Sequence, residues 1–510
     1  MTSADFAGTP VPGGRWKYFT AIWVLLSVVA AIFSVGMPLT SGPDEPAHFV
    51  KAAAVVRGEL SGTPSKDGTV FQVPAYVAYT PAQTCTAYNA EATGNCAPVT
   101  PEPTGLIMEG TTTAGSYNPV YYAIIGWPSL LLNDQAGLYA MRIVSGIVAS
   151  ALLALGFMML RTWQRRLLPM LGALIAITPM VLYLNGIVNP SSLEVAGSFA
   201  AFVALLSIII DRRPSLLTER MIILTVGAAL ACSTRSISPL WVALLLLVPL
   251  LLLSGRALLD LVRQRAVWIG ISVVVLAAAS GLAWTVLSSS LTLADPQNPG
   301  STIYANVGAS PAFGFVKMIM LSVNIGQQMI GILGWFDTLL PLVVYFLFSA
   351  LIGALGITAA VILRGRRAVM ALALFAVLII GPAVVQAIYI TGGGFIWQGR
   401  YTLPLFVCAI LGVAALVSET WTSIDLRLAR RLSALVGAIW VASQLLSFLQ
   451  ALRRYTVGAS GSYTLVFTGP AWTPPLGSAT LVAVMLIALS LIAYLSLRKS
   501  AVVVTERVSA

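Results

Sequence analysis

Charged side chains are scarce in this chain of 510 residues, of which Asp, Glu, Lys and Arg together make up 9%. Soluble domains carry about a quarter of their residues as charged side chains, so the composition excludes a soluble fold. The only histidine is His48, which follows Glu45 at the Glu-x-x-His spacing of carboxylate-bridged di-metal proteins. Those centres need a second such pair, so a di-metal site is excluded. A mononuclear site for a divalent cation stays open, and no other cofactor is indicated.

Three further signals are missing from the sequence. No G-x-S-x-G motif accompanies His48, so a Ser-His-Asp hydrolase is not indicated. No small-residue cleavage site follows the first apolar run, so residues 18–40 are expected to be a retained helix and not a signal peptide. No internal repeat is visible, whereas many transporters are built from inverted repeats.

Apolar residues make up 58% of the chain, and runs of about the length that spans a bilayer recur from end to end. This pattern predicts an all-α polytopic membrane protein with one membrane domain, residues 18–497. The runs at 221–235 and 237–254 are short and are broken by STRSISP. The twelve expected spans are 18–40, 138–160, 168–185, 191–210, 221–235, 237–254, 267–289, 338–363, 368–390, 401–418, 432–450 and 478–497.

Basic residues lie in short clusters between these runs and give a net charge of +11. Because the clusters are separated by apolar runs, they do not indicate nucleic-acid binding. Placing every cluster in the cytoplasm satisfies the positive-inside rule for a bacterial plasma membrane. Both termini, 1–17 and 498–510, are then cytoplasmic, and the long segments 41–137, 290–337 and 451–477 lie outside. Function is expected on this elaborated outer face.

The four cysteines divide between the two environments. Cys232 and Cys408 lie inside apolar runs and are expected to be packing residues. Cys85 and Cys96 lie in the outer segment 41–137, where disulfides persist, so we predict a bridge between them. The alternative is two free thiols.

The stretch SGPDEPAHF, residues 41–49, places two adjacent carboxylates and the only histidine directly after the first membrane helix. Pro46 is suited to the first turn of a helix, which we expect to lie at the membrane interface. Asp44 and Glu45 would then stand at the helix N-terminus, where the helix dipole favours negative charge. Helix capping is therefore the alternative to a catalytic role. A second interfacial or re-entrant helix is expected in YNPVYYAIIGWPSLLL, 117–132, which is too short and aromatic to span.

The motifs PDEPAHF, NPVYY, NP at 189–190, GWFDTLLP and QGRYTLP follow one another along most of the chain. This succession resembles DUF2142, a family of predicted bacterial membrane proteins of unknown function that is grouped with the GT-C glycosyltransferases. The resemblance implies a GT-C-like bundle and a polyprenyl-phosphate sugar donor. It also implies that an acidic residue in the first outer loop is the catalytic base, here Asp44 or Glu45.

The chemistry of inverting transfer assigns candidate roles. A carboxylate must take the proton of the acceptor hydroxyl, and we prefer Asp44, with Glu45 or His48 orienting it. The lipid-phosphate leaving group needs fixed positive charge, for which the candidates are Arg400, Arg235, Lys51 and Arg142. The candidates for binding acceptor or sugar are Tyr117, Asn118, Tyr121, Trp335, Asp337, Trp397, Gln398 and Tyr401.

Each of these assignments has a structural alternative. Arg400 could snorkel to the interface beside its aromatic neighbours. Lys51 could meet the donor phosphate or Glu45, and Arg142 could pair with Asp134 or line the cavity. Two motifs are read as helix starts: Ser191-x-x-Glu194 as a capping box, and Asp337 as an N-cap.

Four functions compete at this stage. The first is a glycosyltransferase acting on a cell-envelope glycan, glycolipid or protein. The second is a transporter or flippase of lipid-linked sugars, the third an envelope polysaccharide polymerase or ligase, and the fourth an assembly scaffold. Acidic residues concentrated outside favour the enzyme. The alanine-rich composition fits a high-GC bacterium, where decaprenyl-phosphate arabinose would be a natural donor, but sugar and acceptor stay open.

Overall fold

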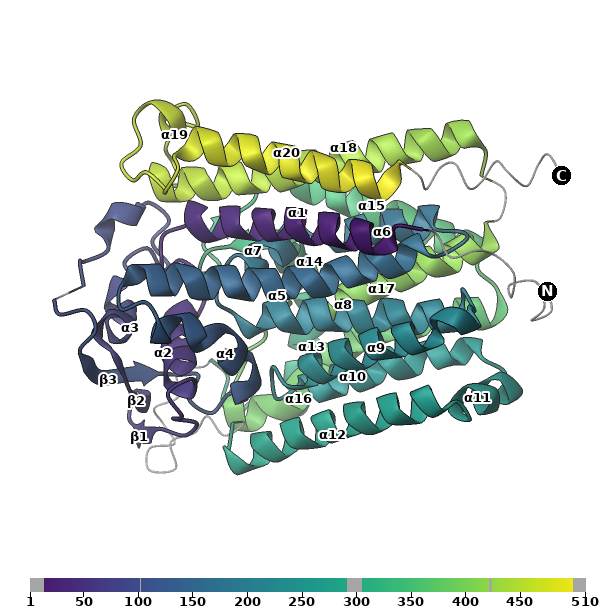
Figure 1. Cartoon of the computed structure of the whole chain (residues 1–510), viewed down its shortest axis with the longest axis horizontal. Helices are drawn as coiled ribbons and strands as arrows, with labels where there is room; N and C mark the ends of the chain where they lie inside the picture. Colours follow the sequence, from purple (N-terminus) through teal and green to yellow (C-terminus); the bar gives the residue numbers. More distant parts are fainter. Residues whose placement is uncertain (1–12, 101, 291–304, 422–423, 499–510) are drawn as a thin grey trace.

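The computed structural model describes residues 13–100, 102–290, 305–421 and 424–498. Its long helices lie side by side along the longest axis of the molecule (Figure 1). Within the described ranges ten helices are long and apolar enough to cross a membrane, or eleven if one bent pair counts as a span. The ten are α1 (Arg15–Gly36), α5 (Gln135–Arg161), α8 (Pro190–Ile209), α9 (Leu217–Cys232), α12 (Arg265–Leu287), α15 (Leu342–Ile362), α16 (Gly365–Gly393), α17 (Gly399–Thr420), α18 (Leu426–Thr456) and α20 (Ser478–Leu497).

Two of the twelve predicted spans differ from the structure. The span expected at 168–185 is a pair of helices, α6 (Leu167–Ala176) and α7 (Pro179–Asn185), bent by 66°. Pro179 has no N–H to continue the first helix, so it begins a new one. The span expected at 237–254 is α10 (Ser238–Leu247) followed by the 3₁₀ turn η6 (Val248–Leu252), where Pro249 breaks the α-helical bonding. This unit is too short to count as a full crossing.

Helix α8 is the centre of the bundle. Its whole length is buried, and it packs on α5, α9 and α17. A helix that is apolar on all sides fits such a position, because it has no face to expose. The NP dipeptide at 189–190 begins this helix and therefore lies at one end of the protein core.

One end of the bundle gathers basic side chains from several helix ends. Arg15 pairs with Glu219 at 2.9 Å, and Arg161 lies over the ring of Tyr18. The first helix begins and α20 ends here, where the Tyr18 hydroxyl donates to Ser496. The chain therefore begins its first span and ends its last one at the same end.

The opposite end carries the polar segment 41–137 (left in Figure 1). It contains a three-stranded antiparallel sheet in the order β1-β2-β3, with Phe71 of β2 opposite Gly110 of β3. Short helices surround the sheet, and Cys85 and Cys96 form a disulfide, with Cα atoms 6.0 Å apart. The elements are α2 (Glu45–Val55), β1 (Thr63–Ser65), β2 (Gly68–Pro74), α3 (Ala75–Ala78), η2 (Thr80–Gln83), η3 (Gly94–Cys96), β3 (Ile107–Thr112), α4 (Pro119–Gly126) and η4 (Trp127–Leu130).

Helix α2 is not the interfacial helix that its sequence predicted. Its residues are buried almost throughout, with Phe49 and Val50 fully covered. Helix α4, strands β2 and β3 and the short helices pack around it. The alanine-rich stretch allows this close packing on several sides, so α2 is a core helix of the polar segment at this end of the bundle.

The segment 290–337 also builds part of this end, although its residues 291–304 lie outside the described ranges. It forms α13 (Pro311–Met320), α14 (Ser322–Gly331) and a small hairpin of β4 (Ile332–Leu333) and β5 (Thr338–Leu339). The hairpin carries a tight turn at 334–337, in which Gly334 and Phe336 have positive φ angles. In the third segment α19 (Leu465–Thr468) is the only helix within 458–477, and α11 (Gly255–Val262) lies at the basic end.

Candidate active site

Asp44 occupies the bend between the first membrane helix and α2. Its backbone is left-handed, with φ of 60°, a conformation that Asp tolerates better than most residues. It is the N-cap residue of α2, yet its side chain makes no capping hydrogen bond. Instead the carboxylate, 43% exposed, forms an ion pair with Arg400. Helix capping, the alternative role predicted for this carboxylate, is therefore not what it does.

Arg400 lies in the first turn of α17 with its side chain 1% exposed. Besides the ion pair with Asp44, it donates to the carbonyl of Pro43 at 3.5 Å and lies 5.6 Å from the ring centre of Phe336. Snorkelling to the interface, the alternative predicted for this residue, is wrong because protein surrounds the side chain. Burying a guanidinium is expensive, and its single carboxylate partner is itself open to solvent.

Arg235 is a second buried guanidinium beside the first. It lies between α9 and α10, donates to Asn189 Oδ1 at 3.2 Å and stands 3.9 Å from Glu194. Its guanidinium is 4.8 Å from the ring centre of Tyr401, and that of Arg400 is 5.3 Å from the same ring. Two positive charges therefore meet at one tyrosine, close to the exposed carboxylate.

Glu194 belongs to this cluster and not to a capping box. It accepts a hydrogen bond of 2.6 Å from the Ser238 hydroxyl, while Asn189 caps α8 by accepting from the Ser191 N–H. The capping box predicted at Ser191 is wrong because the helix begins at Pro190, directly after its asparagine cap. Glu194 thus supplies negative charge to Arg235 from inside the bundle.

The electrostatics favour an ionised Asp44 and a neutral His48. Burial opposes ionisation of Asp44, but the positive charges around it, chiefly that of Arg400, together outweigh burial and hold the pKa of the carboxyl below its ordinary value. Burial lowers the pKa of His48 to about 3, so the imidazole is uncharged at neutral pH. His48 Nδ1 shares a hydrogen bond of 2.9 Å with the Tyr122 hydroxyl.

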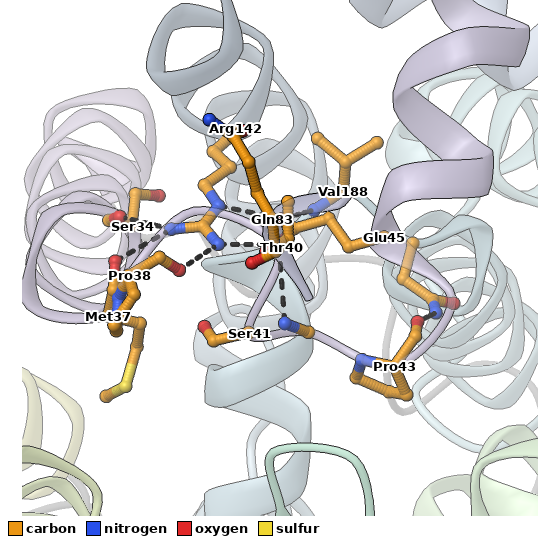
Figure 2. Close-up of polar contacts among 12 residues, drawn as sticks. Ser34, Met37, Pro38, Thr40, Ser41, Pro43, Glu45, Gln83, Arg142 and Val188 are labelled. Carbon is orange, nitrogen blue, oxygen red and sulfur yellow. Dashed lines mark hydrogen bonds and ion pairs between the residues drawn. The ribbon is translucent and has the colours of Figure 1, made fainter. Parts of the chain in front are cut away.

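Glu45, the neighbouring carboxylate, is fully buried (Figure 2). Arg142 donates to both of its oxygens, at 2.7 and 2.5 Å, and the backbone N–H groups of Gly42 and Val188 donate to it as well. Arg142 also donates to the carbonyls of Ser34, Met37 and Pro38. This network fixes the linker that leads from the first membrane helix to Asp44.

The pairing of Arg142 with Glu45 corrects one expectation. Asp134, the partner considered for Arg142, instead caps α5 by accepting from the N–H of Ala136 at 2.9 Å. Among the described residues Lys51 donates to the carbonyls of Leu60 and Gly115 and forms no ion pair with Glu45. Burial lowers the pKa of Lys51 to about 8. Arg142 and Lys51 therefore both hold backbone segments in place through carbonyl groups.

Several aromatic candidates lie around the two arginines. The Tyr117 ring is 5.8 Å from Arg235 and 6.0 Å from His48. The Trp397 ring packs edge-on against Tyr401 at 6.1 Å, and its indole donates to Thr402. These rings form the walls of the site and are brought together from distant parts of the chain.

Other candidates lie apart from Asp44 or have structural partners. Asn118 caps α4, and the Tyr121 hydroxyl bonds to Ser145. Gln398 is the N-cap residue of α17, and its side chain makes no capping bond. Asp337 does not cap a helix, because β5 follows it; its carboxylate pairs with Arg454 at 3.4 Å. These contacts do not include the two arginines.

The sequence did not identify how the turn at 334–337 connects the site. Trp335 donates to the carbonyl of Thr40 in the linker, and Phe336 lies against Arg400. Arg454, which binds Asp337, also donates to three carbonyls of the disulfide loop, those of Thr86, Asn89 and Ala92. The GWFDTLLP motif was the available signal, but the contacts that join this turn to the linker, to Arg400 and to the disulfide loop are long-range.

Within the described ranges no group of three or more His, Cys, Asp or Glu side chains is arranged to hold a metal ion. Asp44 and Glu194 are the carboxylates beside the two arginines: Asp44 binds Arg400, and Glu194 binds Ser238 and stands near Arg235. The chemistry of the site is therefore that of a carboxylate beside two guanidinium groups.

The family model described as "Predicted membrane protein (DUF2142)" matches residues 26–409. Similar solved structures include two crystal structures of ArnT from Cupriavidus metallidurans, one bound to undecaprenyl phosphate and one in the apo state. Each is 14% identical to this chain with a TM-score of 0.41, and the alignments cover 96% and 94% of this chain and 78% of ArnT. Similarity at this level is evidence of neither a shared reaction nor a shared substrate. No curated protein matches the chain.

Proposed function

The chain belongs to the DUF2142 family of predicted membrane proteins, and from the geometry around Asp44 we propose that it is a membrane glycosyltransferase. Its donor is a polyprenyl-phosphate sugar, and its acceptor is a cell-envelope glycan, glycolipid or protein. The observation that carries the proposal is the half-exposed Asp44 carboxylate paired with buried Arg400, with buried Arg235 against the same Tyr401 ring.

In the proposed reaction, Asp44 takes the proton of the acceptor hydroxyl while that oxygen forms a bond to the anomeric carbon. The bond from the anomeric carbon to the phosphate oxygen breaks, and its electron pair leaves with the lipid phosphate. Arg400 and Arg235, whose side chains are buried, stabilise this developing charge. The attack comes from the face opposite the leaving group, so the configuration of the sugar inverts.

Burial distinguishes the roles of the neighbouring residues. Glu45 accepts four hydrogen bonds in the buried network, so it acts as a positioning residue for the linker. His48 is uncharged at neutral pH and orients the site through Tyr122. Arg142 uses all five of its N–H groups on protein acceptors and Lys51 donates to two carbonyls, so we assign the phosphate to Arg400 and Arg235.

We propose that the site faces the outside of the plasma membrane. The support is the position of the basic residues at the other end of the bundle, where Arg15 and Arg161 lie near the ends of α1 and α5. Positively charged loops stay in the cytoplasm. Both chain termini are cytoplasmic in this arrangement, and the sheet and the disulfide are outside.

The test is transfer in proteoliposomes that contain the full chain, a labelled polyprenyl-phosphate sugar and an envelope-glycan extract. We expect the label to appear in glycan and free polyprenyl phosphate to be released in equal amount. A transporter would instead move the labelled lipid between leaflets without cleaving it. Intact labelled lipid in every reaction would contradict the proposed enzyme.

The pH dependence of transfer tests the ion pair. Because Arg400 lowers the pKa of Asp44, wild-type kcat/KM should stay level near neutral pH and fall only when acid protonates the carboxylate. Removing the positive charge in Arg400→Gln raises that pKa, so the fall should begin at higher pH. The overall rate of Arg400→Gln also drops, because the phosphate loses one guanidinium. The quantity to compare is therefore the pH at which the acid limb begins, and not the maximal rate.

Tyr401→Phe is the matched control for the pH profile. It removes a hydroxyl that accepts from Arg400 at 3.4 Å but leaves the guanidinium charge in place. Its acid limb should coincide with that of wild type. An Arg400→Gln profile with an unmoved acid limb would mean that Asp44 is not the group whose protonation limits transfer.

A further inference from the structure

A polar cavity lies at the end of the bundle that carries the three-stranded sheet, apart from the two arginines. Its volume is about 530 Å³, and it lies between the end of α1, the start of α5, the disulfide loop and the loop that follows α18. Its lining includes Gln83, Glu102, Asp134, Tyr139 and Trp472. Neither the family match nor the reaction proposed above assigns it a ligand.

Three side chains that line this cavity, those of Gln83, Glu102 and Asp134, present hydrogen-bond acceptors. Gln83 is 3% exposed, and its amide nitrogen donates to Pro98 and Thr100, whereas its buried oxygen has no protein partner in the described chain. Glu102 and Asp134 each use one carboxylate oxygen for a backbone N–H, those of Thr104 and Ala136. A buried acceptor without a donor is costly, so the cavity suits a ligand rich in hydroxyl groups.

The charge of the cavity is opposite to that of the catalytic site. Two carboxylates line it, while two guanidinium groups stand near Asp44. A phosphate or any other anion would be repelled by Glu102 and Asp134, so the cavity does not suit the lipid-phosphate donor. The two sites therefore suit two different substrates.

Two aromatic rings give the cavity a flat apolar surface. Trp472 and Tyr139 are both partly exposed and line it together. Two contacts hold Trp472 in place. Its backbone N–H donates to the carbonyl of Thr456, and Gly94 lies so close to its ring that a Cβ on residue 94 would come within 2.6 Å of a ring atom. Aromatic faces with nearby polar groups suit ligands that have both C–H and O–H surfaces.

The cavity is connected to Asp44 through the linker that follows the first helix. Pro38 and Leu39 line the cavity, and Asp44 is the sixth residue after Pro38. The Pro38 carbonyl is held by Arg142 at 2.7 Å, and the Thr40 hydroxyl donates to the Gln83 carbonyl (Figure 2). The Glu45–Arg142 network thus fixes the cavity and the catalytic carboxylate relative to each other.

We propose that this cavity binds a neutral, polyhydroxylated saccharide, which is part of the acceptor glycan. The identity of the saccharide as acceptor rests on the proposed function, whereas its binding does not. The ring stacks on Trp472, and its hydroxyl groups donate to Gln83, Glu102 and Asp134. The glycan then extends along the linker and presents a hydroxyl to Asp44.

The test is a saturation-transfer NMR titration of the full detergent-solubilised chain with methyl glycosides of neutral hexoses and pentoses and with their disaccharides. We expect Trp472→Ala to weaken binding roughly tenfold or more, as truncation of a central aromatic anchor does. The double variant Glu102→Gln/Asp134→Asn keeps an acceptor for each backbone N–H and should weaken binding less. Trp127→Ala is the control, because this tryptophan is 48% exposed but does not line the cavity.

Transfer kinetics complete the test. Trp472→Ala should raise KM for the acceptor and leave KM for the donor unchanged. Saccharide binding that is equal in wild type and Trp472→Ala would overturn the proposal, and so would binding of amino sugars alone. If Asp44→Asn abolishes transfer but Trp472→Ala binds the saccharide as well as wild type does, only the proposed saccharide site is wrong. If Trp472→Ala weakens saccharide binding but Asp44→Asn transfers sugar at the normal rate, only the proposed catalytic role of Asp44 is wrong.

Discussion

Asp44→Asn is expected to reduce sugar transfer by about 10²- to 10⁴-fold, the usual contribution of a general base. Asparagine preserves the shape of the side chain and tolerates the left-handed backbone of Asp44, so the chain should still fold, with some loss of stability because buried Arg400 loses its carboxylate partner. It cannot take a proton from the acceptor hydroxyl. The measurement is initial rate in proteoliposomes at saturating donor, together with donor affinity.

The control for this variant is Asp67→Asn, which changes an exposed aspartate in the turn between β1 and β2 of the same outer segment. It should transfer at the wild-type rate. Glu45→Gln is the informative comparison, because a positioning residue affects stability as well as rate. Normal transfer by Asp44→Asn together with complete loss in a stably folded Glu45→Gln would assign the base to Glu45.

Arg142→Met is expected to cause the largest loss of stability. It leaves Glu45 as a buried carboxylate without its partner, which costs about 3–5 kcal/mol, and it frees three backbone carbonyls as well. The measurement is the denaturation midpoint in detergent. The double variant Arg142→Met/Glu45→Gln should recover part of the loss, because the uncompensated charge is gone.

Arg57→Met is the control for loss of an arginine without loss of an ion pair. Arg57 is partly buried just after α2, donates to Ala53 and to Ser129, and has no carboxylate partner among the described residues. Its loss should be clearly smaller than that of Arg142→Met. If Arg142→Met/Glu45→Gln is no more stable than Arg142→Met alone, the loss of stability does not come from an uncompensated charge on Glu45.

The sequence was enough to name candidate residues but not to predict their contacts. Asp44 and Arg400 were chosen separately, from a motif and from a basic residue at a helix start, and the structure pairs them across 356 positions. The pairing of Arg142 with Glu45 could not be predicted, because it depends on how the linker folds between the first helix and α2. Periodicity describes one element at a time and does not contain such distances.

Each wrong prediction has one of two physical causes: tertiary packing, or competition between neighbouring residues for the same structural role. Helix α2 has the composition of an interfacial helix, but the sheet and α4 cover the faces that it would expose. At the start of α8 two residues could cap the helix, and Asn189 does so, which leaves Glu194 free to approach Arg235. The short span expected at 237–254 is interrupted by Pro249. This proline was visible in the sequence, but the leucines around it make the whole run apolar enough to resemble a span.

The most direct test of the proposed chemistry is an experimental structure of the full chain with a polyprenyl phosphate bound. We predict that the phosphate lies within hydrogen-bonding distance of Arg400 and Arg235, and that the Asp44 carboxylate faces the position of the departed sugar. A phosphate bound at the basic end of the bundle, or one with no contact to either arginine, would contradict the proposed site.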